Sequence, residues 1–118
     1  MGRVNNKVVI VTGAAKGMGA AFAEKLVSEG AYVVLTDVDV EAGQKLASEI
    51  GGNAYFMRLD VASEAEWREV IRVTEARFGY VSVLVNNAGI VSYAAVEVLE
   101  ESDFRRIIDV NQVGVFLG

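Results

Sequence analysis

The sequence predicts an α/β protein with a doubly wound parallel sheet, and three observations support this fold class. Short apolar runs alternate with longer segments of helical periodicity, which is the pattern of repeated strand–helix units. The runs at residues 7–12, 32–36 and 81–85 are rich in Val, Ile, Leu and Tyr, as in strands covered on both faces. A glycine-rich turn directly follows the first run. With a less apolar strand at residues 54–59, we expect one domain over residues 1–118 and the strand order 3-2-1-4.

Three helices are expected to follow the first three strands. The first spans residues 18–29 and the second residues 40–50, and glycine follows each of them. The third helix extends to residue 78 and begins at Ser63, whose spacing from Glu66 matches a capping box. The first helix carries its larger apolar side chains on one face: Met18, Phe22 and Leu26.

A fourth helix is expected from about residue 102 onward. Five positions form a stripe along one face of this helix: Phe104, Ile107, Ile108, Asn111 and Val115. Asn111 is the polar member of an otherwise apolar stripe. A buried amide costs free energy unless it is hydrogen-bonded, so Asn111 is either a satisfied core residue or a functional one.

Composition and charge argue against several classes of protein. The chain has 11 basic and 16 acidic residues without a basic cluster, which argues against binding to nucleic acid or to an anionic membrane. The absence of Cys and His removes disulfides, the usual zinc ligands and a Ser-His-Asp triad from this chain. The apolar run at residues 8–11 is too short for a signal peptide or a membrane span, so we expect a cytoplasmic location.

The turn after the first strand predicts an anion site. It reads Thr12-Gly13-Ala14-Ala15-Lys16-Gly17-Met18-Gly19, and a helix follows at once. Backbone N–H groups and the positive end of the helix dipole therefore point at one spot, which suits a dinucleotide pyrophosphate. Gly13 allows a sharp turn, Gly17 allows the backbone to approach a phosphate, and Gly19 allows close helix packing. The alternative is a purely structural turn, because three residues separate Gly13 from Gly17 where the common fingerprint has one.

Asp37 predicts which dinucleotide binds. It ends the second strand about 20 residues beyond the glycine turn, where an acidic residue accepts the hydroxyl protons of the adenosine ribose. Asp37 would repel a 2′-phosphate, whereas Lys16 would attract one. We weight Asp37 more heavily and expect NAD in preference to NADP, because a carboxylate facing a phosphate costs more than an exposed lysine without a partner. The alternative role for Asp37 is that of a cap or turn residue, like Asp39.

With these motifs the sequence resembles the short-chain dehydrogenase/reductase family along essentially its whole length. Five features in register carry the resemblance: Thr12-Gly13-x-x-x-Gly17-x-Gly19, Asp37, Asp60-Val61, Asn86-Asn87-Ala88-Gly89, and Asn111. The resemblance implies a Rossmann-type NAD(P)-binding domain that serves hydride transfer between a nicotinamide and a secondary alcohol or ketone. In the family, a tyrosine acidified by a lysine passes the proton and a serine orients the oxygen.

The resemblance also assigns roles to individual residues. Asp60 and Val61 are expected beside the adenine. Asn111 is expected among the catalytic residues, where it distorts its helix and holds a water of the proton relay. Turn formation is the second interpretation of Asn86-Asn87, and both are compatible. The remaining expected cofactor residues lie in the glycine turn, after the second strand and between the two riboses: Gly13, Lys16, Gly17, Met18, Gly19, Asp37, Val38, Asn87, Ala88 and Gly89.

The family's serine and Tyr-x-x-x-Lys motif follow the asparagine that matches Asn111, and no tyrosine in this chain has a lysine four residues later. We therefore expect the cofactor-binding portion of a longer protein, truncated before the catalytic motif and marginally stable or self-associating alone. The expected partners are a small alcohol or ketone and, at full length, further copies in a dimer or tetramer, with no nucleic acid or membrane. A non-catalytic NAD(P)-binding module and a different α/β nucleotide binder are the alternative functions.

Overall fold

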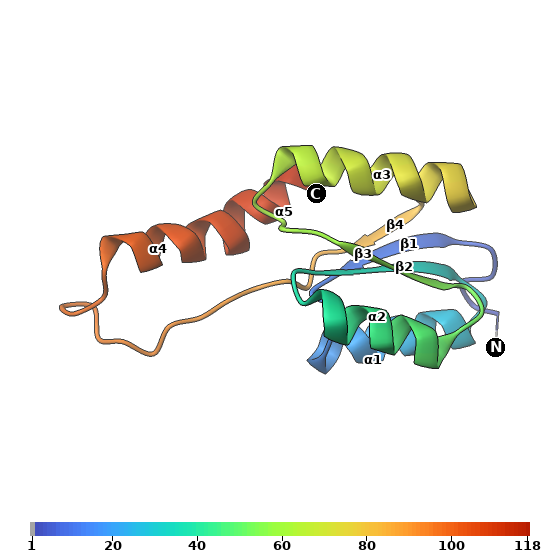
Figure 1. Ribbon diagram of the computed structural model, residues 1–118, viewed down its shortest axis with the longest axis horizontal. Coiled ribbons are helices and arrows are strands. Elements are labelled where there is room, and N and C mark those ends of the chain that lie inside the picture. The colour runs from blue at the N-terminus through green and yellow to red at the C-terminus, as the bar shows by residue number, and fades with distance from the viewer. Residues whose placement is uncertain (1) are drawn as a thin grey trace.

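Four parallel strands form the centre of the protein, whose computed structural model describes residues 2–118 (Figure 1). Their order across the sheet is β3-β2-β1-β4, which confirms the predicted order. Because all strands run in one direction, their carboxyl ends meet along one edge of the sheet. The strands are β1 (Val8–Thr12), β2 (Tyr32–Asp37), β3 (Ala54–Arg58) and β4 (Val83–Val85).

Helices cover both faces of the sheet. The helices α1 and α2 lie against one face, and α3 lies against the other with the C-terminal helices (Figure 1). Within residues 2–118, no helix has the length and hydrophobicity needed to cross a membrane. The bounds are α1 (Gly17–Ser28), α2 (Val40–Ile50), α3 (Glu64–Phe78), α4 (Glu101–Ile108), the π-helix η1 (Asp109–Val113) and α5 (Gly114–Leu117).

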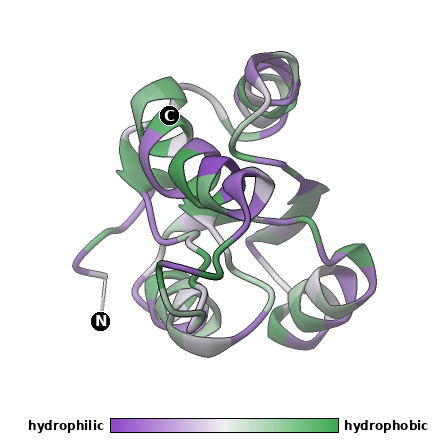
Figure 2. Cartoon of the chain, turned by 90° about the vertical axis from the view of Figure 1, so that its left-hand side faces the viewer, coloured by the Kyte–Doolittle hydropathy of each residue, from purple (hydrophilic) through white to green (hydrophobic). Residues whose placement is uncertain are grey.

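The side chains of β1 alternate between two hydrophobic clusters. Val9 and Val11 belong to the cluster under α1 and α2, whereas Ile10 packs with Trp67 and Val70 of α3. All five residues of β1 are buried, because helices cover both of its faces. In Figure 2 the strands are mainly hydrophobic, and the helices combine hydrophobic and hydrophilic residues. The sheet therefore lies between two hydrophobic cores and contributes side chains to both.

Small residues form the face of α1 that packs on the sheet. The side chains of Met18 and Phe22 remain 70% and 41% exposed, while Gly19 and Ala23 are buried against the sheet. Small residues allow the helix axis to approach the strands closely, so the buried face of α1 is the face without large side chains. The stripe of Met18, Phe22 and Leu26 therefore indicated a helix, and the side of α1 that packs on the sheet contains Gly19 and Ala23.

The predicted fourth helix is interrupted, and its expected apolar stripe is not the buried one. The π-helical segment η1 separates α4 from α5, and each π turn contains about one extra residue. The inner residues are Val110 and Gly114, whereas Phe104 and Val115 are 52% and 44% exposed. A Cβ at Gly114 would lie 2.6 Å from Cγ2 of Val61, so glycine allows this helix to pack closely on the loop that follows β3.

Two buried threonines give opposite predictions for stability. The Thr74 hydroxyl on α3 has no hydrogen-bond partner in the described part of the chain, and the residue is fully buried. We predict that Thr74→Val raises the free energy of unfolding by about 1 kcal/mol, because valine removes an unpaired polar atom without changing the shape.

The matched control is Thr36→Val. The Thr36 hydroxyl is equally buried but donates a hydrogen bond to the carbonyl oxygen of Val11 at 3.0 Å. This variant is expected to lower the free energy of unfolding by about 1 kcal/mol. Urea denaturation of both variants measures the two signs, and a loss of stability in both would contradict the assignment of Thr74 as unpaired.

Candidate functional site

The N-terminus of α1 is free of capping side chains. Lys16 stands at the N-cap position without a side-chain hydrogen bond, and no acidic residue lies in the first turn of α1. By contrast, Asp39 caps α2 by accepting from the N–H of Ala42, and Ser63 caps α3 by accepting from the N–H of Glu66. The exposed start of α1 therefore presents uncapped N–H groups and the positive end of the helix dipole to a ligand.

The three glycines of the turn have distinct geometries. Gly13 and Gly17 adopt positive φ of 62° and 63°, which favours glycine at both positions. A Cβ at Gly19 would lie 2.3 Å from the carbonyl oxygen of Gly13, so α1 begins in direct contact with the turn. Around a Cβ placed at Gly17 there is nothing within 4 Å. This open space beside uncapped N–H groups fits a phosphate.

Thr12 and Asn87 join the glycine turn to the end of β4. The Thr12 hydroxyl accepts from the N–H groups of Asn87 and Ala88, each at 2.9 Å. In return, the Asn87 side-chain amide donates to the carbonyl oxygens of Thr12 and Gly13, each at 3.1 Å. The structural interpretation of the asparagine turn thus holds. The prediction missed this role of Thr12, although a threonine that ends a buried strand before the turn was a visible signal.

The Asp37 side chain also makes hydrogen bonds that stabilise the turns around it. One of its carboxylate oxygens accepts from the N–H of Ala15 at 3.0 Å, and the other accepts from the N–H of Asp39 at 3.0 Å. The turn interpretation therefore describes Asp37, and the cap interpretation describes Asp39. Each carboxylate oxygen can accept more than one hydrogen bond, so Asp37 retains capacity for a ligand. The first of these bonds ties the end of β2 to the glycine turn.

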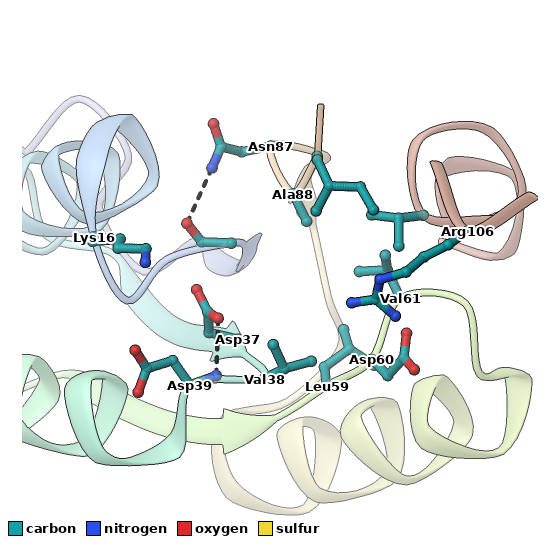
Figure 3. A pocket seen from close by; sticks show the side chains of 14 residues that line it. Lys16, Asp37, Val38, Asp39, Leu59, Asp60, Val61, Asn87, Ala88 and Arg106 are labelled. Atoms are coloured by element: carbon teal, nitrogen blue, oxygen red, sulfur yellow. Dashed lines mark hydrogen bonds between the residues drawn. The ribbon is translucent and has the colours of Figure 1, made fainter. Parts of the chain in front are cut away.

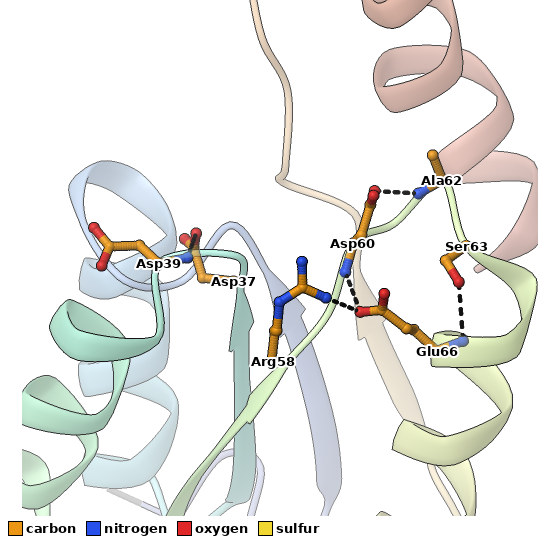
Figure 4. Close-up of polar contacts among 7 residues, drawn as sticks. All are labelled: Asp37, Asp39, Arg58, Asp60, Ala62, Ser63 and Glu66. Atoms are coloured by element: carbon orange, nitrogen blue, oxygen red, sulfur yellow. Dashed lines mark hydrogen bonds and ion pairs between the residues drawn. The ribbon is translucent and has the colours of Figure 1, made fainter.

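Asp60 follows β3 and is oriented by its own turn (Figure 4). Its carboxylate accepts from the N–H of Ala62 at 3.0 Å, and its backbone N–H donates to the Glu66 carboxylate at 2.9 Å. The Glu66 carboxylate also pairs with Arg58. The capping box is therefore only half formed, because Glu66 reaches to Asp60 and Arg58 while the N–H of Ser63 donates to the carbonyl oxygen of Asp60.

A cavity of about 410 Å³ opens beside these strand ends (Figure 3). Nine residues of the predicted cofactor site line it: Gly13, Lys16, Asp37, Val38, Asp60, Val61, Asn87, Ala88 and Gly89. Four predicted residues do not line it, namely Gly17, Met18, Gly19 and Asn111. Five further residues, which sequence reasoning missed, complete the wall: Asp39, Leu59, Ile90, Arg106 and Val110.

Charge is distributed unevenly around the cavity. Asp37 and Asp39 lie near Lys16 on one side, and Asp60 and Arg106 lie on the side of β3 and α4 (Figure 3). Among residues 2–118, no group of three or more acidic side chains is arranged to hold a metal ion. The cavity therefore offers carboxylates for hydroxyl or amino donors and cations for an anion or an aromatic ring.

Asn111 lies in η1 and is exposed, which excludes the alternative that it is a satisfied core asparagine. Its side-chain N–H donates to the carbonyl oxygen of Ile90 at 2.8 Å, and its side-chain oxygen accepts from the N–H of Ile90 at 2.8 Å. This pair of bonds replaces a strand partner for the segment after β4. Asn111 thereby holds that segment against the distorted helix.

These bonds predict a measurable effect on backbone exchange. Asn111→Ala is expected to speed hydrogen exchange of the Ile90 amide by roughly tenfold, because the variant removes the acceptor of that N–H. NMR-detected exchange measures the rate. Gln112→Ala is the matched control, since the Gln112 side chain is exposed and makes no hydrogen bond within residues 2–118. Equal exchange in both variants would show that Asn111 does not hold Ile90.

The fold and the glycine turn define the class, an α/β protein of Rossmann-like topology with its cavity at the carboxyl ends of the strands. Residues 7–118 match the family model described as short chain dehydrogenase. The chain belongs to the short-chain dehydrogenase/reductase family. This confirms the resemblance stated from the sequence motifs.

Relatives in the family differ in their named substrates and cofactors. The chain is 42% identical over 116 residues to a 3-beta-hydroxysteroid dehydrogenase of Comamonas testosteroni, covering 98% of this chain and 46% of that protein. It is also 42% identical over 118 residues to an NADP-dependent (R)-specific alcohol dehydrogenase of Lentilactobacillus kefiri, covering 98% of this chain and 47% of that protein. The chain thus spans about half the length of the curated relatives it matches.

A solved structure shares the arrangement of nearly the whole chain. The crystal structure of 3-ketoacyl-(acyl-carrier-protein) reductase from Brucella melitensis, complexed with NADH, matches with a TM-score of 0.93 at 36% sequence identity. The match covers 97% of this chain and 47% of that chain. The Rossmann-like fold and the strand order predicted from the sequence are therefore confirmed.

Proposed function

We propose that this chain binds a nicotinamide dinucleotide in the cavity at the strand ends and forms the cofactor-binding part of an oxidoreductase. One observation carries the proposal: the uncapped N-terminus of α1 adjoins a cavity that also contains the Asp37 carboxylate. A pyrophosphate needs the first feature, and a ribose with free hydroxyls needs the second. When bound, the nicotinamide accepts or supplies the hydride for a small alcohol or ketone substrate.

Different residues of the chain bind different parts of the dinucleotide. In this proposal, the turn from Gly13 to Gly19 with Lys16 and Met18 holds the pyrophosphate. Asp37 and Val38 hold the adenosine ribose, and Asp60 and Val61 hold the adenine. The segment Asn87-Ala88-Gly89 lies between the two riboses, where its small residues leave room. The open space at Gly17 and the lining of the cavity support this division.

Asn111 is our proposed catalytic residue within the chain. It lies in the distorted π-helical segment, and its side chain already holds the backbone of Ile90 on the cavity wall. We propose that this arrangement positions the proton relay of the full-length enzyme. For that enzyme we further propose a single Rossmann domain, a dimer or tetramer, and a cytoplasmic location.

The pyrophosphate site is tested by Gly17→Asp. We predict that the variant abolishes NADH binding in a fluorescence titration, because a carboxylate would occupy the space proposed for a phosphate. Gly52→Asp is the matched control, since Gly52 also has a positive φ, of 56°, and a Cβ placed there would have nothing within 4 Å. Both variants carry the same backbone strain and the same charge, so equal NADH affinities would contradict the site.

NAD rather than NADP is our proposed cofactor, because Asp37 lies where a 2′-phosphate would be repelled. We predict that the wild-type chain binds NADH at least tenfold more tightly than NADPH. Asp37→Asn should reduce that ratio by about tenfold by removing the repulsion. Asp39→Asn removes a charge from the same wall while retaining a good helix cap, so it should leave the ratio near the wild-type value. A wild-type preference for NADPH would show that Lys16 dominates.

A further inference from the structure

Arg106 is a cation on the cavity wall that no sequence motif identified. It lies on α4 one helical turn before Val110, so both residues face the same side of the helix. Figure 3 shows the Arg106 side chain extending from α4 toward the strand end that carries Asp60 and Val61. Arg106 therefore contributes a guanidinium to the side of the cavity opposite the glycine turn.

The Arg106 guanidinium has no partner within residues 2–118, neither a carboxylate nor an aromatic ring. Asp60 lines the same cavity, yet no ion pair joins it to Arg106 in this part of the chain. Five other arginines are engaged: Arg58 with Glu66, Arg68 with Glu64, Arg72 with Glu69, Arg105 with Glu101, and Arg77 over the Tyr55 ring. Arg106 and Asp60 thus line one cavity without pairing with each other, so both groups are available to a ligand.

The surface between Arg106 and Asp60 has the chemistry of a purine site. Leu59, Val61 and Val110 supply an apolar wall that suits the face of a flat ring. The Asp60 carboxylate suits an amino donor on the edge of that ring. A guanidinium stacks on aromatic faces and donates to ring nitrogens, which an ammonium group does less well.

We infer that Arg106 binds the adenine ring of the dinucleotide, an inference that rests on the proposed function of the cavity. Arg106 covers the ring from the side of α4, while Asp60 accepts from its amino group. Lys16 lies on the far side of the cavity beside the glycine turn, so phosphate binding does not require Arg106 (Figure 3). Arg106 is accordingly a specificity residue for the base.

Calorimetric titration with three ligands tests this assignment: 5′-AMP, adenosine 2′,5′-bisphosphate and inorganic pyrophosphate. Arg106→Ala should weaken the two adenosine ligands equally, by about 2- to 30-fold, and leave pyrophosphate binding unchanged. Arg106→Lys should also bind 5′-AMP more weakly than the wild type, because lysine keeps the charge and lacks the planar group. Arg105→Ala is the matched control with unchanged affinities, since Arg105 pairs with Glu101 at the surface.

Three results would overturn the inference. A loss confined to adenosine 2′,5′-bisphosphate would make Arg106 a ligand of the 2′-phosphate. An equal loss for pyrophosphate would make it a general counter-charge, and unchanged 5′-AMP affinity would remove it from the site. If the wild-type chain binds none of the three ligands, the proposed function itself fails. Circular dichroism of each variant confirms folding, and Arg106→Lys decides the question should Arg106→Ala unfold.

Discussion

The buried hydroxyl of Thr12 accepts hydrogen bonds from the N–H groups of Asn87 and Ala88. The side-chain amide of Asn87 donates two hydrogen bonds to the carbonyl oxygens of Thr12 and Gly13. Thr12 and Asn87 are 75 residues apart in the sequence and stand at the carboxyl ends of adjacent strands. Without the Thr12 hydroxyl, two N–H groups that leave β4 would lose their acceptor, at a cost of about 1–3 kcal/mol each where they are buried. This link joins the glycine turn to the end of β4, and residues of both segments line the cavity.

Acidic residues around the cavity accept hydrogen bonds from the backbone and stabilise its turns before any ligand binds. Asp37 orders the end of β2 and the glycine turn through two backbone N–H groups, and Asp60 orders the loop before α3. These bonds fix the direction of each carboxylate while leaving lone pairs free. Arg58 pairs with Glu66 and makes no ion pair with Asp60 within residues 2–118 (Figure 4). Turn formation and ligand recognition are thus compatible roles for the same side chain.

Local patterns predicted the features that depend on neighbouring residues. The buried strands β1 and β2, the glycine turn and the caps at Asp39 and Ser63 all follow from short-range spacing. Hydrophobicity indicates apolar residues without indicating which of them a neighbour covers, so the apolar stripe expected along the last helix is not its buried side. In α1 the small face of Gly19 and Ala23 packs on the sheet, because close approach of the backbone outweighs the burial of Met18.

By itself, the sequence determined the alternation of strands and helices, the family, and the position of Asp37 at a strand end, because each depends on short and regular spacings. Only the tertiary structure identified the five further residues of the cavity wall. Leu59 and Ile90 follow β3 and β4, which end at a common edge of the sheet, and Arg106 lines the same cavity from α4. The π-helical segment η1 then sets which side of α5 packs on Val61. About one added residue in the π turn rotates the residues that follow it around the helix axis.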